Sequence, residues 1–155
     1  ELAGAATRLF PEMVQARQTV LFSWCIMPDH LHLLLKDEDI VDFVRLFKGR
    51  LTPLARRLEH GRVLWQRSFY DHALREEESL EKVARYIWQN PVRSGIISCA
   101  SAYRRNGSLV WPIRVGINPT LTTNCWDLIR VGINPTPTNR NEMIKLVLME
   151  VNGEW

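Results

Sequence analysis

Two histidines separated by one residue are the part of this sequence best suited to chemistry. His30 and His32 lie in an apolar run, residues 24–35, which the turn-forming pair Pro28-Asp29 interrupts. Side chains two apart along a strand point to the same face, so the two imidazoles project together. Neighbouring imidazoles on a rigid strand can bind one divalent metal ion. A purely structural pair of histidines has the same spacing, so the pair alone does not decide between the two roles.

A tyrosine and an asparagine four residues apart form a second candidate group. They lie in a segment with helical spacing that follows a run of acidic residues and the potential cap Ser79. We expect this helix to stop at about Asn90, because Pro91 disfavours helical backbone in the residue before it. Tyr86 and Asn90 then share one helix face, one turn apart. A phenol and an amide at a helix end are ordinary by themselves, and a helical tyrosine is usually a half-buried packing residue.

Two other tyrosines and a third histidine are alternatives for the site. Tyr70 lies in a strand-like segment beside His72, and Tyr103 lies in a polar loop. Neither tyrosine has a potential metal ligand one helical turn away. His72 fits a site residue and a structural hydrogen bond equally well.

The hydrophobic pattern predicts the elements that would position these side chains. The turn at Pro28-Asp29 predicts a hairpin with strands over residues 20–27 and 30–36. Residues 63–75 predict two short strands or one bent ribbon. A capping-box pattern near the end of the chain opens one more helix. The predicted helices span residues 2–18, 40–58, 79–90 and, for the short final one, 139–151.

Length and composition indicate one ordinary globular domain with room for an appendage. The chain has 155 residues, of which 46% are hydrophobic and 24% charged, and its net charge is +3. This mildly basic balance is compatible with nucleic acid without indicating it. Three scattered cysteines form no even disulfide framework and no metal-binding spacing, so we expect a reducing, cytoplasmic location. No apolar run reaches the ~18 residues of a membrane span and no signal peptide is visible, so we expect no membrane partner.

The last third of the chain has a different character. The heptapeptide Arg-Val-Gly-Ile-Asn-Pro-Thr occurs at residues 114–120 and again at 130–136. Its Gly, Asn and Pro residues favour turns over a regular core element. We therefore expect a domain over residues 1–108 and an irregular, repeat-containing appendage over residues 109–155. Our hypothesis is that the reading frame here runs into a duplicated genomic element.

Three sequence blocks together resemble the REP-associated tyrosine transposases, a branch of the single-tyrosine HUH transposases. The block Met-Pro-Asp-His-Leu-His-Leu-Leu at residues 27–34 resembles the family's His-hydrophobic-His motif. The blocks at residues 64–72 and 85–95 resemble two further family motifs, in the family's order. The resemblance covers residues 9–111. Two departures are expected: the strand that the family places before its first helix is missing, and the tail has no family counterpart.

The resemblance implies a ferredoxin-like α+β fold, in which helices pack on an antiparallel sheet that carries the histidine pair. It implies His30 and His32 as ligands of Mg²⁺ or Mn²⁺, Asn90 as a third ligand and Tyr86 as the nucleophile. The implied reaction is cleavage and rejoining of single-stranded hairpin DNA, such as a REP element, through a 5′-phosphotyrosine. The cation would polarise the phosphate. Monomer and homodimer both remain open.

Basic side chains are the candidates for contacts with the DNA backbone. A solvated helix face explains most of them equally well. Trp65 and Phe69 are candidates for stacking on unpaired bases, although burial in the core is the commoner fate of such side chains. The candidate backbone contacts are Arg45, Lys48, Arg50, Arg56, Arg57, Arg67 and Arg93.

Two alternatives to the strand-transfer enzyme remain. The first is a catalytically inactive transposase remnant that only binds hairpin DNA, which a missing strand and an unusual tail would favour. The second is a metallohydrolase in which the histidine pair activates water. It would cleave DNA without a covalent protein–DNA adduct and without any need for Tyr86.

Overall fold

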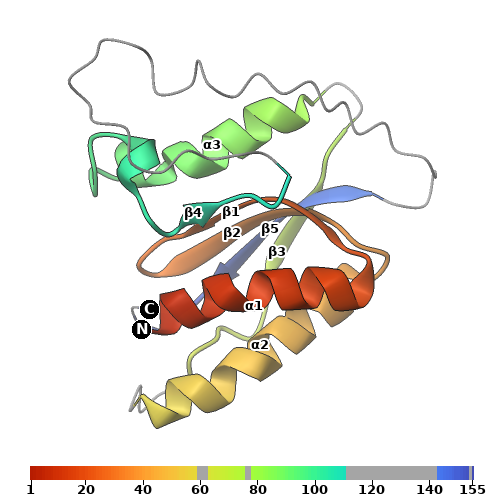
Figure 1. Cartoon of the computed structure of the whole chain (residues 1–155), viewed down its shortest axis with the longest axis vertical. Coiled ribbons are helices and arrows are strands. Elements are labelled where there is room, and N and C mark those ends of the chain that lie inside the picture. The colour runs from red at the N-terminus through yellow and green to blue at the C-terminus, as the bar shows by residue number, and fades with distance from the viewer. Residues whose placement is uncertain (59–62, 76–77, 111–142, 154) are drawn as a thin grey trace.

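Three helices pack on the two faces of one five-stranded antiparallel sheet (Figure 1). The computed structural model describes residues 1–58, 63–75, 78–110, 143–153 and 155. The strand order in the sheet is β3-β5-β2-β1-β4, and the predicted α+β fold with packed helices is confirmed. No helix in these ranges is long and apolar enough to cross a membrane. The elements are α1 Leu2–Arg17, β1 Val20–Ile26, β2 His30–Lys36, α2 Ile40–Arg57, β3 Tyr70–Ala73, α3 Leu80–Arg93, the short 3₁₀ turn η1 Ala100–Ala102, β4 Asn106–Gly107 and β5 Ile144–Glu150.

The hairpin β1–β2 forms where the sequence predicts it. The turn is closed by the amide of Met27, which donates to the carbonyl of His30 at 2.8 Å. The strands pair from Val20 with Lys36 to Ile26 with Leu31, with one irregularity between Leu21 and Ser23. The two strands are almost entirely buried, so a continuous apolar run is what this central position requires.

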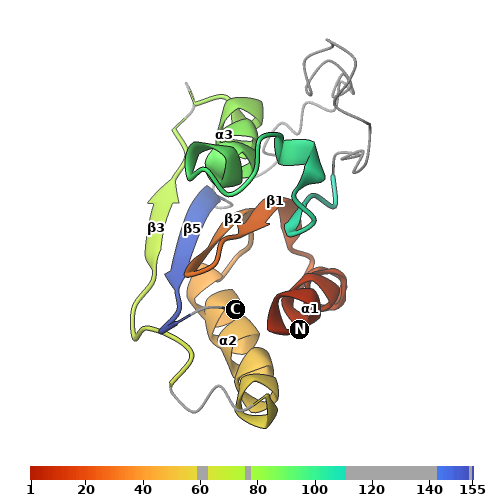
Figure 2. The same cartoon turned by 90° about the vertical axis from the view of Figure 1, so that its left-hand side faces the viewer.

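The two faces of the sheet carry different helices, as Figure 2 shows. Leu31, Leu33 and Leu35 of β2 belong to the larger core, which α1 and α2 cover. Leu34 belongs to the smaller core, together with Ile87 and Trp88 of α3. Because side chains alternate along a strand, His30 and His32 point to the α3 face with Leu34.

Helix α3 is longer than predicted, because it runs through Pro91 to Arg93. Pro91 has no amide hydrogen to donate to the carbonyl of Ile87 four residues back. The side-chain amide of Asn90 donates to that carbonyl instead, at 3.1 Å. This substitute hydrogen bond is a physical reason why the helix does not end at Asn90. The predicted cap at the other end is confirmed, since the Ser79 hydroxyl accepts a hydrogen bond from the amide of Lys82.

The predicted final helix is wrong in the part that the structure describes, because residues 144–150 form β5. This strand lies inside the sheet, where it pairs with β2 over all seven of its residues and with β3 over four, from Lys145 to Leu148. Its apolar residues are nearly consecutive, which suits a strand with a core on each face better than a helix with one apolar side. Part of the sequence expected to form an appendage therefore belongs to the sheet, whereas the heptapeptide repeats lie outside the described residues.

Residues after β5 form backbone hydrogen bonds with the turn of the β1–β2 hairpin. The amide of Val151 donates to the carbonyl of Asp29 at 2.9 Å, and the amide of Trp155 donates to that of Pro28 at 3.1 Å. The Trp155 ring packs edge-on against Trp65, with ring centroids 5.3 Å apart. The two chain ends lie side by side in both views (Figures 1 and 2).

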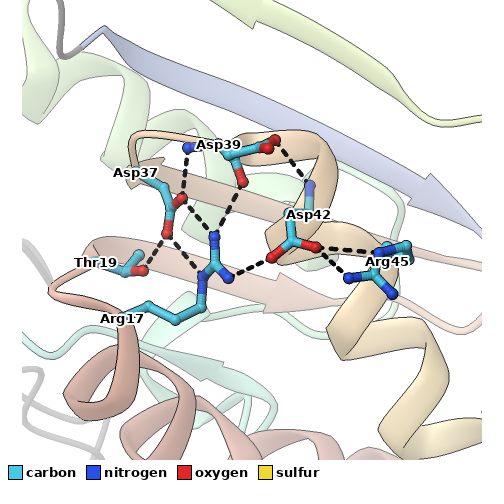
Figure 3. A network of polar contacts seen from close by, with 6 residues as sticks. All are labelled: Arg17, Thr19, Asp37, Asp39, Asp42 and Arg45. Carbon is cyan, nitrogen blue, oxygen red and sulfur yellow. Dashed lines mark hydrogen bonds and ion pairs between the residues drawn. The ribbon is translucent and has the colours of Figure 1, made fainter.

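A polar network fixes the start of α2 to the end of α1 (Figure 3). The Arg17 guanidinium donates to Asp37 at 3.0 Å and to Asp42 at 2.5 Å. The buried Asp37 carboxylate also accepts from the hydroxyl of Thr19 and from the amide of Asp39. The hydrogen bonds that Arg17 donates to the Asp37 carboxylate and, to a smaller extent, to the Asp42 carboxylate raise the pKa of Arg17. The network satisfies the buried carboxylate and cross-links the segments on either side of the hairpin.

Gly107 in β4 is expected to tolerate no side chain. A Cβ atom at this position would lie 1.7 Å from the ring of Trp24, which is itself buried against Phe10 with ring centroids 5.1 Å apart. Gly107→Ala should therefore lower the free energy of unfolding by about 1–3 kcal/mol or more, since the ring has little room to move. Denaturant unfolding of the purified chain measures this.

The matched control is Gly49→Ala in α2, where a Cβ would meet nothing within 4 Å. A helical glycine replaced by alanine should be stabilising by about 0.5–1 kcal/mol. Equal effects at the two positions would contradict the close approach of Trp24 to β4.

Candidate active site

The histidine pair lies at the start of β2 with its ring nitrogens facing each other. Nε2 of His30 and Nε2 of His32 are 3.1 Å apart. The Nδ1–H of His30 donates to the carboxylate of Asp29 at 2.6 Å, which fixes the ring so that Nε2 points toward His32. His32 is buried, and this burial, with a smaller contribution from His30, lowers its pKa to about 4. His32 is therefore neutral near pH 7, the form of imidazole that binds metals.

The geometry of the pair fits one divalent cation. Two nitrogen ligands at roughly 2.1 Å from an octahedral ion and at right angles to each other lie about 3 Å apart. The observed 3.1 Å between the two Nε2 atoms is compatible with this value, and it is also the length of a hydrogen bond between the two rings. Among the described residues no group of three or more His, Cys, Asp or Glu side chains is placed to hold a metal ion. A third protein ligand from this part of the chain would be of another type, such as the predicted amide.

Helix α3 carries Tyr86 and Asn90 on the same side of the sheet as the histidines. Its buried residues Ala84, Ile87 and Trp88 pack on the sheet, and Tyr86 next to them is 44% exposed. The helix that carries the phenol and the amide thus lies over the face of the sheet to which the imidazole pair points. Their roles in catalysis stay a prediction.

Asn90 is oriented by its own helix. Its amide nitrogen donates to the carbonyls of Tyr86 and Ile87, both at 3.1 Å. The amide oxygen, on the other branch of the side chain, is the atom suited to a cation. The hydrogen bond by which the Asn90 amide nitrogen takes the place of the donor that Pro91 lacks therefore also fixes the position of the Asn90 oxygen.

Arg93 is the one candidate DNA contact that lies beside Tyr86. Its guanidinium carbon is 4.7 Å from the centre of the Tyr86 ring, a cation–π distance. Arg93 is exposed near the end of α3, so its charge is available to a phosphate that approaches the phenol. Residues seven apart share a helix face but lie two turns from each other, so the contact depends on the side-chain conformations and could not be derived from spacing alone.

The basic residues of α2 lie on the opposite side of the sheet from the histidines. Arg45 pairs with Asp42, and the Lys48 ammonium donates to the carbonyls of Gln66 and Ser68 at 3.0 and 3.2 Å. These contacts show that Lys48 ties α2 to the loop before β3. Arg50, Arg56, Arg57 and the loop residue Arg67 are exposed. The structure therefore does not bring the α2 residues together with the histidine pair, and their role in DNA binding stays a prediction.

The alternative site residues and the expected stacking residues have structural partners. The Tyr103 hydroxyl donates to the carbonyl of Ile26 at 2.7 Å, and its partial burial raises its pKa. His72 lies 3.3 Å from the Glu78 carboxylate, which fits a structural hydrogen bond. Trp65 is buried and Phe69 packs against the larger core, so burial prevails over base stacking for both. Tyr70 is exposed and is the exception.

Comparisons with known proteins assign a class to this fold and site. Residues 1–90 match the family described as "Transposase IS200 like". This match covers more than half of the chain, so the protein belongs to the IS200-like transposase family.

The names of two similar proteins indicate a branch within this family. A Haemophilus influenzae protein with the name "Putative REP-associated tyrosine transposase" is 29% identical over 117 residues, which cover 63% of this chain and 66% of the relative. The REP-associated tyrosine transposase of Escherichia coli is 26% identical over 86 residues, which cover 51% of this chain and 48% of the relative. These similarities support the REP-associated branch that the motifs predict. The chain spans about half to two thirds of the length of these relatives, and no solved structure matches it.

Proposed function

We propose that this chain cleaves and rejoins single-stranded, hairpin-forming DNA, with Tyr86 as the nucleophile. The observation that carries the proposal is the position of α3, which lies over the face of the sheet to which His30 and His32 point. Membership of a transposase family supports DNA as the partner.

In the proposed reaction the Tyr86 oxygen attacks a backbone phosphorus from the side opposite the leaving oxygen. The Oη–P bond forms, the bond from phosphorus to the 3′ oxygen breaks, and the departing oxygen takes up a proton. The phenolic proton is lost to solvent. The products are a 5′-phosphotyrosine on the protein and a free 3′-OH. A 3′-OH can attack the phosphotyrosine in turn, which rejoins DNA without an external energy source.

The side chains around Tyr86 would bind and orient the phosphate. His30, His32 and the Asn90 oxygen would hold the cation. Bound Mg²⁺ or Mn²⁺ would supply positive charge to a non-bridging phosphate oxygen. Arg93 beside the Tyr86 ring adds a fixed positive charge, which attracts the anionic strand toward the phenol.

The test is to incubate the full chain and Mn²⁺ with hairpin DNA labelled at one end. We expect an SDS-resistant adduct with 3′-labelled DNA, because the protein stays on the 5′-phosphate of the downstream fragment. With 5′-labelled DNA we expect a shorter, protein-free fragment that ends in a 3′-OH. Binding without cleavage would indicate the inactive remnant, and cleavage without an adduct would indicate a metallohydrolase.

A further inference from the structure

Tyr70 is an exposed aromatic side chain that the proposed reaction does not use. Within the described ranges, Tyr70 and Tyr86 are the aromatic side chains that remain exposed, and Tyr70 is the more exposed of the two at 63%. An exposed tyrosine offers an apolar ring face that can stack on a flat ligand, while its hydroxyl stays in water. The neighbouring Phe69 is covered, since it packs against the larger core.

The sheet register places Tyr70 in one row with the histidine pair. Tyr70 in β3 pairs with Leu148 in β5, and Leu148 pairs with His32 in β2. Directly paired residues point to the same face, so all three side chains lie on the α3 face. The opposite orientation of Phe69 agrees with this assignment. Two strand spacings, about 10 Å, separate the backbone positions of Tyr70 and His32.

The surroundings of Tyr70 suit an uncharged, flat ligand. Leu148 between the two rings is half-buried and gives an apolar floor. Glu150, also exposed, pairs with His30 on the same face, and Asp29 lies exposed in the adjoining turn. These carboxylates adjoin the histidine pair, where the cation of the proposed function would offset their charge beside a phosphate. Tyr70 itself offers an exposed ring face, on which a neutral, flat base can stack.

We propose that Tyr70 is a stacking platform for an unpaired base of the DNA strand whose phosphate lies at the histidine pair. This proposal rests on the proposed function for its partner, single-stranded DNA. The roughly 10 Å between the two positions is a span that a nucleotide next to the bound phosphate can bridge. Stacking requires the ring of Tyr70 and not its hydroxyl, which separates this role from that of a nucleophile.

The experiment uses the full chain and a DNA hairpin with a single-stranded flank, in which one adenine at a time is replaced by a fluorescent analogue that stacking quenches. We expect quenching at one flank position. Tyr70→Ala should abolish it and weaken binding of the flanked hairpin by about 5- to 100-fold. Tyr70→Phe should keep the quenching, the binding and the covalent adduct. The matched control Val41→Ala removes a side chain that is 65% exposed on α2, across the sheet, and should change nothing.

Two results would overturn the proposal: unchanged quenching and binding in Tyr70→Ala, or loss of the adduct in Tyr70→Phe, which would make Tyr70 the nucleophile. A failure of the proposed function is recognised separately. If the wild-type chain quenches the analogue through Tyr70 but forms no adduct, the stacking role stands and the cleavage mechanism does not.

Discussion

Val147→Pro is expected to unfold the sheet and to abolish every DNA-dependent activity of the chain. Val147 is fully buried in the middle of β5, where it pairs with Leu33 of β2 and Asp71 of β3. Proline has no amide hydrogen for the ladder and is not tolerated in a central strand. The cost of about 3 kcal/mol or more is a large part of the 5–15 kcal/mol that stabilises a typical domain.

The effect should reach the candidate site, because β5 flanks the strand that carries both histidines. His30 pairs with Glu150 and His32 with Leu148. The measurement is thermal unfolding followed by circular dichroism, together with the adduct assay. We expect a broad transition at lower temperature or none, and no adduct.

Met143→Pro is the matched control for this substitution. Met143 is exposed and lies just before the first residue of β5, so proline there removes no hydrogen bond of the strand. The control should unfold like the wild type. A Val147→Pro variant as stable as the wild type would show that residues 144–150 do not lie inside the sheet.

The sequence could predict the hairpin and the first three helices because their signals are local, whereas the α+β class followed from the family resemblance. The turn at Pro28-Asp29 and the spacing of apolar residues in α1 and α2 need no knowledge of the rest of the fold. The family membership that the three motifs predict is also confirmed. The same reasoning failed at β5, where a capping-box pattern suggested a helix. The competing signal was the nearly unbroken apolar run of residues 144–149, which is typical of a strand buried on both faces.

The candidate site was predictable in its residue types and not in its surroundings. Spacing predicts that His30 and His32 share a face, but only the fold decides that α3 covers this face and α2 the other. For the same reason the basic residues of α2 looked like DNA contacts, although they lie across the sheet from the histidines. The contact of Arg93 with the Tyr86 ring depends on side-chain conformation, which no spacing rule contains.

Tyr86→Phe is expected to remove the covalent adduct while it leaves folding and DNA binding intact. The substitution deletes only the hydroxyl oxygen, which is the proposed attacking atom. The ring that remains can keep its cation–π contact with Arg93, at 4.7 Å in the wild type, and it packs at a partly exposed position. The unfolding temperature should therefore not change, and hairpin binding should stay within about twofold of the wild type. Adduct formation should fall by roughly 10³-fold or more, because loss of a nucleophile removes the covalent step itself.

The control for this prediction is Tyr103→Phe. It also deletes one phenolic oxygen, but that oxygen donates a hydrogen bond to the carbonyl of Ile26. Tyr103→Phe should lower the free energy of unfolding by about 1 kcal/mol and keep the adduct. Tyr86→Phe should thus lose the adduct and keep its stability, whereas Tyr103→Phe should lose some stability and keep the adduct. An adduct that persists in Tyr86→Phe and disappears in Tyr103→Phe would move the nucleophile from α3 to the loop before β4, and the histidine pair would then need a different partner.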